Sequence, residues 1–445
     1  MTLEPGTARA LIAEAVGEAV AAVGARAIAA AGVTSQRTGV VFVDEGGTEL
    51  AVMPNADGRA FAEGLAQEQQ HGETIYRIAG RLPAMLYLPA RYAWMRANEP
   101  DAAACVRYAL SFGDWIVHAL TGEAATDPTQ AAELLVYDVA AGDWSDELLS
   151  MLGVPRSILP PILEPGAAAG ESTGALGLPP GIPVVPAGAD TQCAALAMGM
   201  IERGDAFVVS GTTMLCEHVR ADAAIDPQGR FWTSPLPAGG FVQEAHCGES
   251  GSAIEWVASI IGLSVSDLSA MADDGQPGSG GAVFVDPWPS VASDFALIRS
   301  GALFFPAPVL ALGRPRADIA RAVFEGIAFA ARWGLEQLAT LNGEPRRLAV
   351  AGGVARSHAF LEALAGSTER TVTVATEPAS SALGAAICAA ASSHGGVAQA
   401  AVAMADRGRE VAPDPAHGYP AHDAAWRQRA AEIEARAITR KGLSG

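Results

Sequence analysis

The sequence predicts an α/β protein of two lobes, each a sheet flanked by helices. Its 445 residues exceed the usual size of one domain, and 50% of them are hydrophobic, which is ample for packed cores. Short apolar runs of strand length alternate along the chain with helical patterns. A connector rich in Pro and Gly spans residues 153–182, and we place the boundary between the lobes just beyond it, near residues 188–200.

Composition excludes several classes of function. Acidic residues outnumber Lys and Arg by 49 to 29, and a net charge of −20 opposes binding to polyanions, so we expect no nucleic-acid partner. The five cysteines are widely spaced and lack zinc-site spacing, which is typical of reduced core residues in a cytoplasmic protein. The start of the chain lacks the regions of a signal peptide, and no apolar run reaches membrane-spanning length, so neither export nor a membrane partner is expected.

The first lobe begins with elements of alternating type. We predict helices over residues 7–23, 86–95 and 106–120, and strands over residues 27–33, 40–43 and 50–53. Gln36 and Arg37 follow the first of these strands. Their side chains can hydrogen-bond to the hydroxyls of a small polar ligand, although a solvated loop is the simpler interpretation.

The stretch around which the chain is organised runs from residue 183 to residue 219. An apolar strand over 183–187 breaks at Gly188 and presents Asp190 just before a helical run over 191–198. Open α/β folds bind ligands at the carboxyl ends of strands, and an aspartate there can take a proton from a hydroxyl. Considered alone, Asp190 is more simply explained as a cap of the helix that follows it.

A second candidate element lies between predicted strands over 206–209 and 214–219. Ser210-Gly211-Thr212-Thr213 is a turn of small residues, whose backbone N–H groups and hydroxyls can cradle phosphate oxygens. In isolation it is more simply an ordinary hairpin turn. A carboxylate and a phosphate-sized loop so close in sequence indicate a kinase.

The order and spacing of these elements resemble the FGGY family of sugar kinases, which includes glycerol kinase, xylulokinase and the autoinducer-2 kinases. In that family a G-G-D-x-x or G-A-D-x-Q segment precedes a G-T-[ST] loop, and this chain has Gly188-Ala189-Asp190-Thr191-Gln192 and Gly211-Thr212-Thr213. The resemblance implies an actin-like ATPase (ribonuclease H-like) architecture with a catalytic cleft between the lobes. It implies that Asp190 is the general base and a contact of Mg²⁺, that Thr191 and Gln192 lie beside the sugar, and that the loop binds ATP phosphates.

Two further segments resemble acceptor-binding elements of the family. Glycerol kinase carries N-Q-R-E and the autoinducer-2 kinases S-M-R-E-G where this chain has Ser35-Gln36-Arg37-Thr38-Gly39, so Arg37 is kept and Thr38 stands in the place of Glu. The segment Thr126-Asp127-Pro128-Thr129-Gln130 is similar to the T-D-x-[ST] loop that touches the substrate. Asp127 and Gln130 are therefore candidates as well, with the start of a turn as the simpler alternative for Asp127.

The nucleoside side of the site is expected near residue 352. A strand over 348–351 runs into a pair of glycines, and a helix starts at Ser357, which allows close approach by a nucleotide. This segment is similar to the family's G-G-G-x-[RS]-S element, which implies that Gly352, Gly353, Arg356 and Ser357 lie along ATP. A helix over 318–338 begins with a match to half of a family signature, and residues 377–386 resemble its A-L-G-A-A element.

One family element has no counterpart here. The family opens with a strand, a D-x-G-T turn and a second strand, but no D-x-G-T precedes Ala27, so the first lobe is expected to be incomplete at its start. Losing a phosphate clamp should remove most of the activity. Three explanations are open: the chain begins at an internal Met, the protein is a naturally shortened relative, active or inactive, or another segment fills the gap. The matches at Asp190 and at residues 210–213 favour the first explanation.

We therefore predict an N-terminal, sugar-binding lobe over 1–195, a C-terminal, nucleotide-binding lobe over 196–395 and a helical tail over 396–445. The predicted activity is transfer of the γ-phosphoryl group of ATP, with Mg²⁺, to a hydroxyl of a small sugar or polyol similar to xylulose, ribulose or autoinducer-2. The alternative is a catalytically impaired homologue that binds a sugar or has a regulatory role. A homodimer is the assembly considered.

Overall fold

The computed structural model describes residues 4–82, 84–286, 301–305 and 315–441. Its contacts divide the chain into two compact units. Unit 1 comprises Met1–Ile201, Arg220–Val242 and Ala379–Ala405, and unit 2 comprises Glu202–Val219, Gln243–Pro378 and Asp406–Gly445. The predicted lobes were continuous segments, whereas the chain returns to unit 1 twice.

Unit 1 contains two three-stranded sheets, of order β1-β8-β7 and β3-β2-β4, and the short hairpin β5-β6. Its strands are β1 (Ala31–Ser35), β2 (Val40–Val43), β3 (Glu49–Met53), β4 (Tyr108–Ser111), β5 (Tyr137–Asp138), β6 (Asp143–Trp144), β7 (Gly170–Glu171), β8 (Pro183–Ala189) and β11 (Trp232–Pro235). Strands β1 and β8 are parallel, so their carboxyl ends meet at one edge of their sheet.

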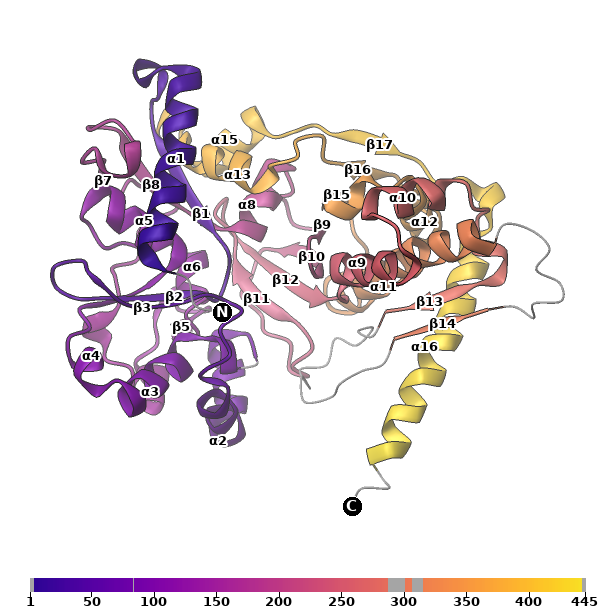
Figure 1. The fold of residues 1–445 in the computed structure, drawn as a ribbon, viewed down its shortest axis with the longest axis horizontal. Helices are drawn as coiled ribbons and strands as arrows, with labels where there is room; N and C mark the ends of the chain where they lie inside the picture. The colour runs from indigo at the N-terminus through magenta and orange to yellow at the C-terminus, as the bar shows by residue number, and fades with distance from the viewer. Residues whose placement is uncertain (1–3, 83, 287–300, 306–314, 442–445) are drawn as a thin grey trace. The chain divides into compact units, whose positions relative to one another are not determined.

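Helices of unit 1 cover these sheets (Figure 1). They are α1 (Pro5–Val23), α2 (Phe61–Ala79), α3 (Leu88–Asn98), α4 (Pro100–Ala104), α5 (Phe112–Thr121), α6 (Pro128–Ala132), α7 (Asp146–Leu152), α8 (Asp190–Ala197), α13 (Ser380–Ala389), α14 (Ala391–His394) and α15 (Val397–Met404). In Figure 1 α13 lies beside α8, although the two are far apart in sequence. A Cβ on Gly384 of α13 would lie 1.9 Å from the carbonyl oxygen of Cys193, so this close packing requires glycine.

Two of the predicted elements of unit 1 need correction. The predicted helix over 106–120 begins as strand β4, which pairs antiparallel with β2, and α5 starts only at Phe112. A short apolar run does not distinguish a strand from a helix, and the true helix start is marked by a capping box of Ser111 and Asp114. The predicted strand over 27–33 is shifted, because residues 25–27 form a 3₁₀ turn before β1.

Unit 2 has a sheet in which the strands run in the order β12-β10-β9-β15-β16-β17, and a separate hairpin, β13-β14. Its strands are β9 (Asp205–Ser210), β10 (Met214–Arg220), β12 (Phe241–His246), β13 (Val283–Val285), β14 (Ala302–Phe304), β15 (Arg347–Gly352), β16 (Val372–Val374) and β17 (Arg409–Val411). Its helices are α9 (Ser250–Ile261), α10 (Val265–Asp273), α11 (Pro315–Asn342), α12 (His358–Thr368) and α16 (Tyr419–Lys441). The parallel pairing of β15 with both β9 and β16 forms the centre of this sheet.

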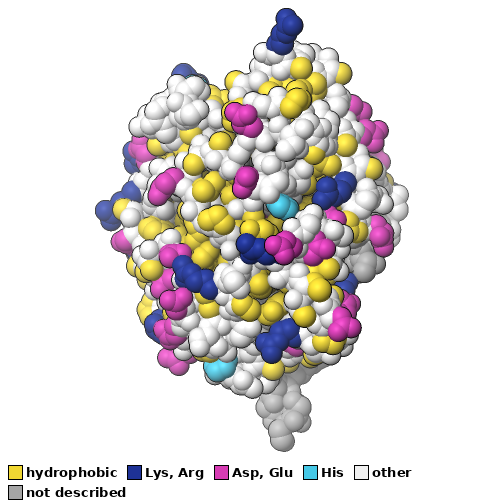
Figure 2. Space-filling model, turned by 90° about the vertical axis from the view of Figure 1, so that its left-hand side faces the viewer, with side chains coloured by type: hydrophobic (Ala, Val, Ile, Leu, Met, Phe, Trp, Pro, Cys, Tyr) yellow, Lys and Arg dark blue, Asp and Glu magenta, His cyan; other side chains and the backbone are white. Residues whose placement is uncertain are grey.

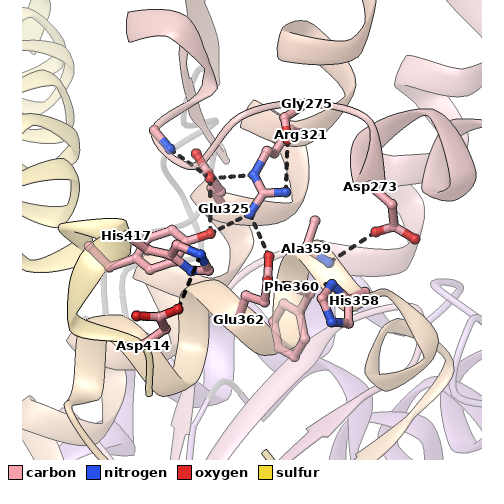
Figure 3. Close-up of polar contacts among 12 residues, drawn as sticks. Asp273, Gly275, Arg321, Glu325, His358, Ala359, Phe360, Glu362, Asp414 and His417 are labelled. Carbon is pink, nitrogen blue, oxygen red and sulfur yellow. Dashed lines mark hydrogen bonds and ion pairs between the residues drawn. The ribbon is translucent and has the colours of Figure 1, made fainter. Parts of the chain in front are cut away.

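A buried polar cluster joins the helices of unit 2 (Figure 3). The Arg321 guanidinium on α11 donates to Glu325 Oε1 at 2.9 Å, to Glu362 Oε2 at 2.7 Å and to the Tyr419 hydroxyl at 2.5 Å. The second oxygen of Glu325 accepts from Ser279 Oγ at 2.6 Å. These residues hold α11, α12 and the start of α16 together, which gives the family-like segment 318–325 a structural role.

Basic side chains do not form a patch on the face of the molecule drawn in Figure 2. On the face drawn in Figure 2, Lys and Arg side chains stand apart from one another among acidic and apolar ones. Among the described helices, none is by itself long and apolar enough to cross a membrane, and α9 with α10 meets that test only as a pair bent by 89°.

Candidate active site

Asp190 stands where β8 ends and α8 begins. Its Oδ1 accepts hydrogen bonds from the backbone N–H of Thr191 at 2.9 Å and from the Thr191 hydroxyl at 3.3 Å. The N-cap position of α8 belongs to Ala189, and no side chain caps the helix there. The explanation of Asp190 as a helix cap is therefore wrong, and its half-buried carboxylate is held by the neighbouring threonine.

The register of β1 against β8 brings the predicted acceptor residues to this carboxylate. Ser35 pairs with Ala189, so Gln36 and Arg37 follow β1 at the same sheet edge where Asp190 follows β8. Burial raises the pKa of Asp190, the positive charge of Arg37 opposes that rise, and the negative charge of Glu133 adds to it. Arg37 and Glu133 thus belong to the electrostatic surroundings of Asp190.

The turn after Arg37 has an unusual backbone. Thr38 has a φ of 64°, in the left-handed region that non-glycine residues seldom adopt. Its carbonyl oxygen accepts from Arg91 Nη1 at 2.5 Å, and the same nitrogen donates to the carbonyl of Met53 at 2.8 Å. The buried Arg91 side chain therefore fixes the turn that presents Gln36 and Arg37.

Residues of helix α6 hydrogen-bond to the carboxyl ends of both β1 and β8, at Ser35 and at Ala189, which precedes Asp190. Asp127 caps this helix, since its Oδ1 accepts from the backbone N–H and the hydroxyl of Thr129, both at 2.7 Å. The Thr129 hydroxyl in turn accepts from the N–H of Ala189 at 2.8 Å. Gln130 Nε2 donates to Ser35 Oγ at 3.1 Å. The structure thus brings Asp127 and Gln130 to the strand ends that carry Arg37 and Asp190.

Unit 1 contains a second group of polar residues that no sequence motif indicated. Arg81 Nη1 lies 2.5 Å from Glu133 Oε1, and Arg81 Nη2 donates to Ser234 Oγ at 2.6 Å. The guanidinium carbons of Arg37 and Arg81 each lie 5.5 Å from the centroid of the Trp232 ring. A lone acid inside the apolar run 131–136 was the available signal for Glu133, because such an acid is rarely buried without a partner.

Several polar atoms of these residues are buried without a hydrogen-bond partner among the described residues. They are Arg81 Nε, Asp127 Oδ2, Gln130 Oε1, Glu133 Oε2, and both amide atoms of Gln192. An unsatisfied buried polar group costs about 1–3 kcal/mol, and native proteins keep few of them. Those of Asp127, Gln130 and Glu133 belong to α6 and its two flanking residues, and α6 bonds to the ends of β1 and β8, where they could receive hydrogen bonds from a polyhydroxyl ligand.

The phosphate-loop candidate forms in unit 2 as a turn between β9 and β10. Gly211, Thr212 and Thr213 are exposed, and the Gly211 N–H donates to the carbonyl of Thr213 at 3.0 Å. Helix α9 begins against this loop, since the hydroxyls of Ser250 and Ser210 lie 2.8 Å apart. A helix N-terminus beside an exposed small-residue turn favours anions.

The nucleoside candidates meet the same sheet edge of unit 2. Gly352 ends β15 and pairs with Ser210, the last residue of β9. Its φ of 102° and a virtual Cβ only 2.1 Å from the Ser210 carbonyl oxygen both require glycine. Gly353 and Arg356 are exposed nearby, whereas Ser357 is buried and caps α12 by accepting from the N–H of Phe360 at 3.3 Å.

The candidate residues of unit 1 and unit 2 include few metal ligands. Within the part of the chain that the structure describes, no three His, Cys, Asp or Glu side chains gather as a metal-binding group. Asp190 offers one carboxylate, which suits Mg²⁺ that is bound largely by substrate phosphates and water.

Comparison with known proteins gives consistent matches. The autoinducer-2 kinases of Salmonella paratyphi A and Yersinia pestis are each 28% identical, over 396 residues (83% of this chain and 73% of the relative) and 388 residues (82% and 72%). The structure of xylulose kinase from Rhodospirillum rubrum aligns with a TM-score of 0.85 at 24% identity, covering 98% of this chain and 91% of that one. Plasmodium falciparum glycerol kinase with ADP gives 0.83 at 17% identity, covering 97% and 91%.

The structural neighbours confirm the predicted two-lobed, actin-like fold class. Two family models also match: the N-terminal domain of the FGGY family of carbohydrate kinases over residues 7–197, and its C-terminal domain over residues 206–393. Since the two matches together cover well over half of its length, this chain belongs to the FGGY family of carbohydrate kinases.

Proposed function

We propose that this protein transfers the γ-phosphoryl group of ATP to a hydroxyl of a small sugar or polyol, with xylulose, ribulose and autoinducer-2 as the first acceptors to test. Membership of the family makes it a phosphotransferase with an alcohol group as acceptor. The autoinducer-2 kinases among its relatives support a short-chain acceptor. The observation that carries the proposal is the Asp190 carboxylate at the end of β8, next to Arg37 and to buried polar groups without partners.

Asp190 is proposed as the general base. The acceptor hydroxyl transfers its proton to the Asp190 carboxylate while its oxygen forms a bond to the γ-phosphorus, and the bond from that phosphorus to the ADP oxygen breaks. Burial raises the pKa of Asp190, which strengthens it as a base, and Arg37 opposes the rise and so favours the charged form. Thr191 fixes the orientation of the carboxylate through Oδ1.

The nucleotide is assigned to unit 2. We propose that Gly211, Thr212 and Thr213 bind phosphate oxygens, and that Gly352, Gly353, Arg356 and Ser357 lie along the nucleoside. Because the protein has a net charge of −20, attraction for ATP must come from backbone dipoles and from the N-terminus of α9. Mg²⁺ bound with ATP would neutralise phosphate charge, and Asp190 is the residue proposed to contact it.

The experiment that tests the base is Asp190→Asn. We expect the rate of ADP release to fall about 10²- to 10⁴-fold, because the variant cannot accept the proton, while calorimetry shows sugar affinity within a few fold of the wild type. Asp267→Asn, an exposed aspartate on α10, is the matched control and should keep full turnover. Normal turnover in Asp190→Asn would refute the assignment, and sugar binding without Mg-ATP binding in the wild type would indicate a sugar-binding protein instead of a kinase.

A further inference from the structure

Unit 1 buries an ion pair whose geometry is incomplete. The Arg81 side chain is 0% exposed and that of Glu133 is 2% exposed, and one oxygen of Glu133 faces Arg81 at 2.5 Å. Burying two charges costs hydration free energy. This cost is offset only when hydrogen bonds satisfy the other polar atoms of the pair, and an apolar pair in the same place is often equally stable. Here Glu133 Oε2 and Arg81 Nε have no hydrogen-bond partner among the described residues. Stability alone therefore does not account for the pair.

The surroundings of the pair place it in the acceptor region. Arg81 shares the Trp232 ring with Arg37, at 5.5 Å from the centroid in each case. Tyr87 packs against the same ring at a centroid distance of 6.4 Å and an angle of 64°, and its side chain also interacts with Arg81. A continuous row of polar groups thus leads from Arg37, which follows β1 beside Asp190, to Glu133.

We propose that Glu133 is a specificity-determining residue of the acceptor site: its Oε2 accepts a hydrogen bond from a sugar hydroxyl other than the one phosphorylated at Asp190. Arg81 and Ser234 act as positioning residues, because they hold the other oxygen of Glu133 and the guanidinium in place. The inference rests on the proposed carbohydrate site of unit 1 and does not require that phosphoryl transfer occurs.

The charges of this region define the class of acceptor. Two arginines, Arg37 and Arg81, lie in this region with three carboxylates, Glu133, Asp190 and Asp127, so it has no excess of positive charge. A carboxylate accepts a hydrogen bond from a hydroxyl but repels another carboxylate or a phosphate. The acceptor selected by Glu133 is therefore a neutral compound with at least two hydroxyl groups, and sugar acids should bind less well.

The test measures sugar binding without ATP. Calorimetry with D-xylulose, D-ribulose, glycerol and D-gluconate should show that the wild type binds at least one neutral probe, and binds gluconate at least about tenfold more weakly. Glu133→Gln should weaken binding of the neutral probe by about 10- to 100-fold, as expected for a hydrogen bond to a charged group. An unchanged affinity in Glu133→Gln, or a wild type that binds none of the neutral probes, would overturn the inference.

Two further variants separate binding from folding. Arg81→Met combined with Glu133→Leu should recover thermal stability, since neither charge is left unpaired, but should not recover sugar affinity. Glu147→Gln removes the carboxylate of an exposed ion pair with Arg77 in the same unit and should leave affinity unchanged. Recovery of affinity in the double variant would show that the pair is only structural. Binding without turnover in the wild type would refute the proposed kinase reaction and leave the role of Glu133 intact.

Discussion

The two units each bury an Arg–Glu cluster, but they complete it differently. In unit 2, Arg321 reaches two glutamates and the Tyr419 hydroxyl, and both oxygens of Glu325 have hydrogen-bond partners. In unit 1, Arg81 and Glu133 each retain a buried polar atom without a partner among the described residues. A satisfied cluster needs no ligand, whereas an unsatisfied one is stabilised when a ligand or ordered water supplies the missing hydrogen bonds.

The comparison separates polar residues that maintain the fold from those proposed to bind substrate. Burial and charge are similar in the two clusters, so neither property distinguishes them. These two clusters differ in how many of their buried donors and acceptors have hydrogen-bond partners, and a buried group without a partner is costly to keep. The most direct tests replace Arg321 of unit 2 and change the protonation of two buried acids of unit 1, Asp114 and Asp127.

The largest effect is expected from Arg321→Met. The substitution leaves the buried Glu325 and the partly buried Glu362 without their shared cation. Breaking a buried pair in this way typically lowers the free energy of unfolding by about 3–5 kcal/mol. Urea unfolding followed by circular dichroism measures the loss.

Sugar affinity of the folded protein is the control for Arg321→Met. It should stay unchanged, because Arg321 belongs to unit 2 and the proposed acceptor residues belong to unit 1. A further Glu325→Leu substitution should recover part of the stability. If Arg321→Met instead abolished sugar binding without loss of stability, the distinction between the two clusters would be lost.

The second effect is a pH dependence of stability in unit 1. Burial, with the charge of Asp127 in addition, raises the pKa of Asp114 to about 7, and burial raises the pKa of Asp127 to about 6. Both acids bind a proton more tightly in the folded state, so their stabilising effect is full below their unfolded pKa and is lost as the pH rises through about 6 to 7. Between pH 5.5 and pH 8 the free energy of unfolding should fall by about 2–3 kcal/mol.

Asp114→Asn should flatten this pH dependence, since the amide oxygen can still accept from the N–H of Ser111 and the side chain no longer ionises. The exposed Asp101→Asn should leave it unchanged. Hydrogen exchange resolved by peptide should locate the loss of protection at α5 and α6. Equal loss along α11 would contradict an origin in unit 1.

The smallest effect concerns Ser357 in unit 2. Its hydroxyl caps α12, so Ser357→Ala should lower the free energy of unfolding by about 1 kcal/mol, and Ser357→Thr should retain most of the cap. Thermal unfolding measures both variants. A rise in the KM for ATP in the alanine variant beyond that of the threonine variant would show that the hydroxyl also contacts the nucleoside, and the side chain would then serve both fold and ligand.

The sequence was sufficient to predict the fold class, the order of most strands and helices, and the positions of Asp190 and of the loop at 210–213. These features depend on local patterns: an apolar strand, a break at glycine and the start of a helix. Strand β4 was missed because its apolar run continues into α5 without a Gly or Pro between them. The ion pair of Arg81 and Glu133 was missed because its partners lie 52 residues apart and share no local signal.

Unit 1 is built from three separate segments of the chain, and this affects when it can fold during synthesis. Trp232 and Ser234 belong to the segment Arg220–Val242, and the helix that packs on α8 belongs to Ala379–Ala405. During synthesis, unit 1 therefore cannot be completed until the ribosome has translated residues 379–405, near the end of the chain. A chain released before that point would lack α13, the helix that packs on α8, and would leave apolar residues of α8 exposed.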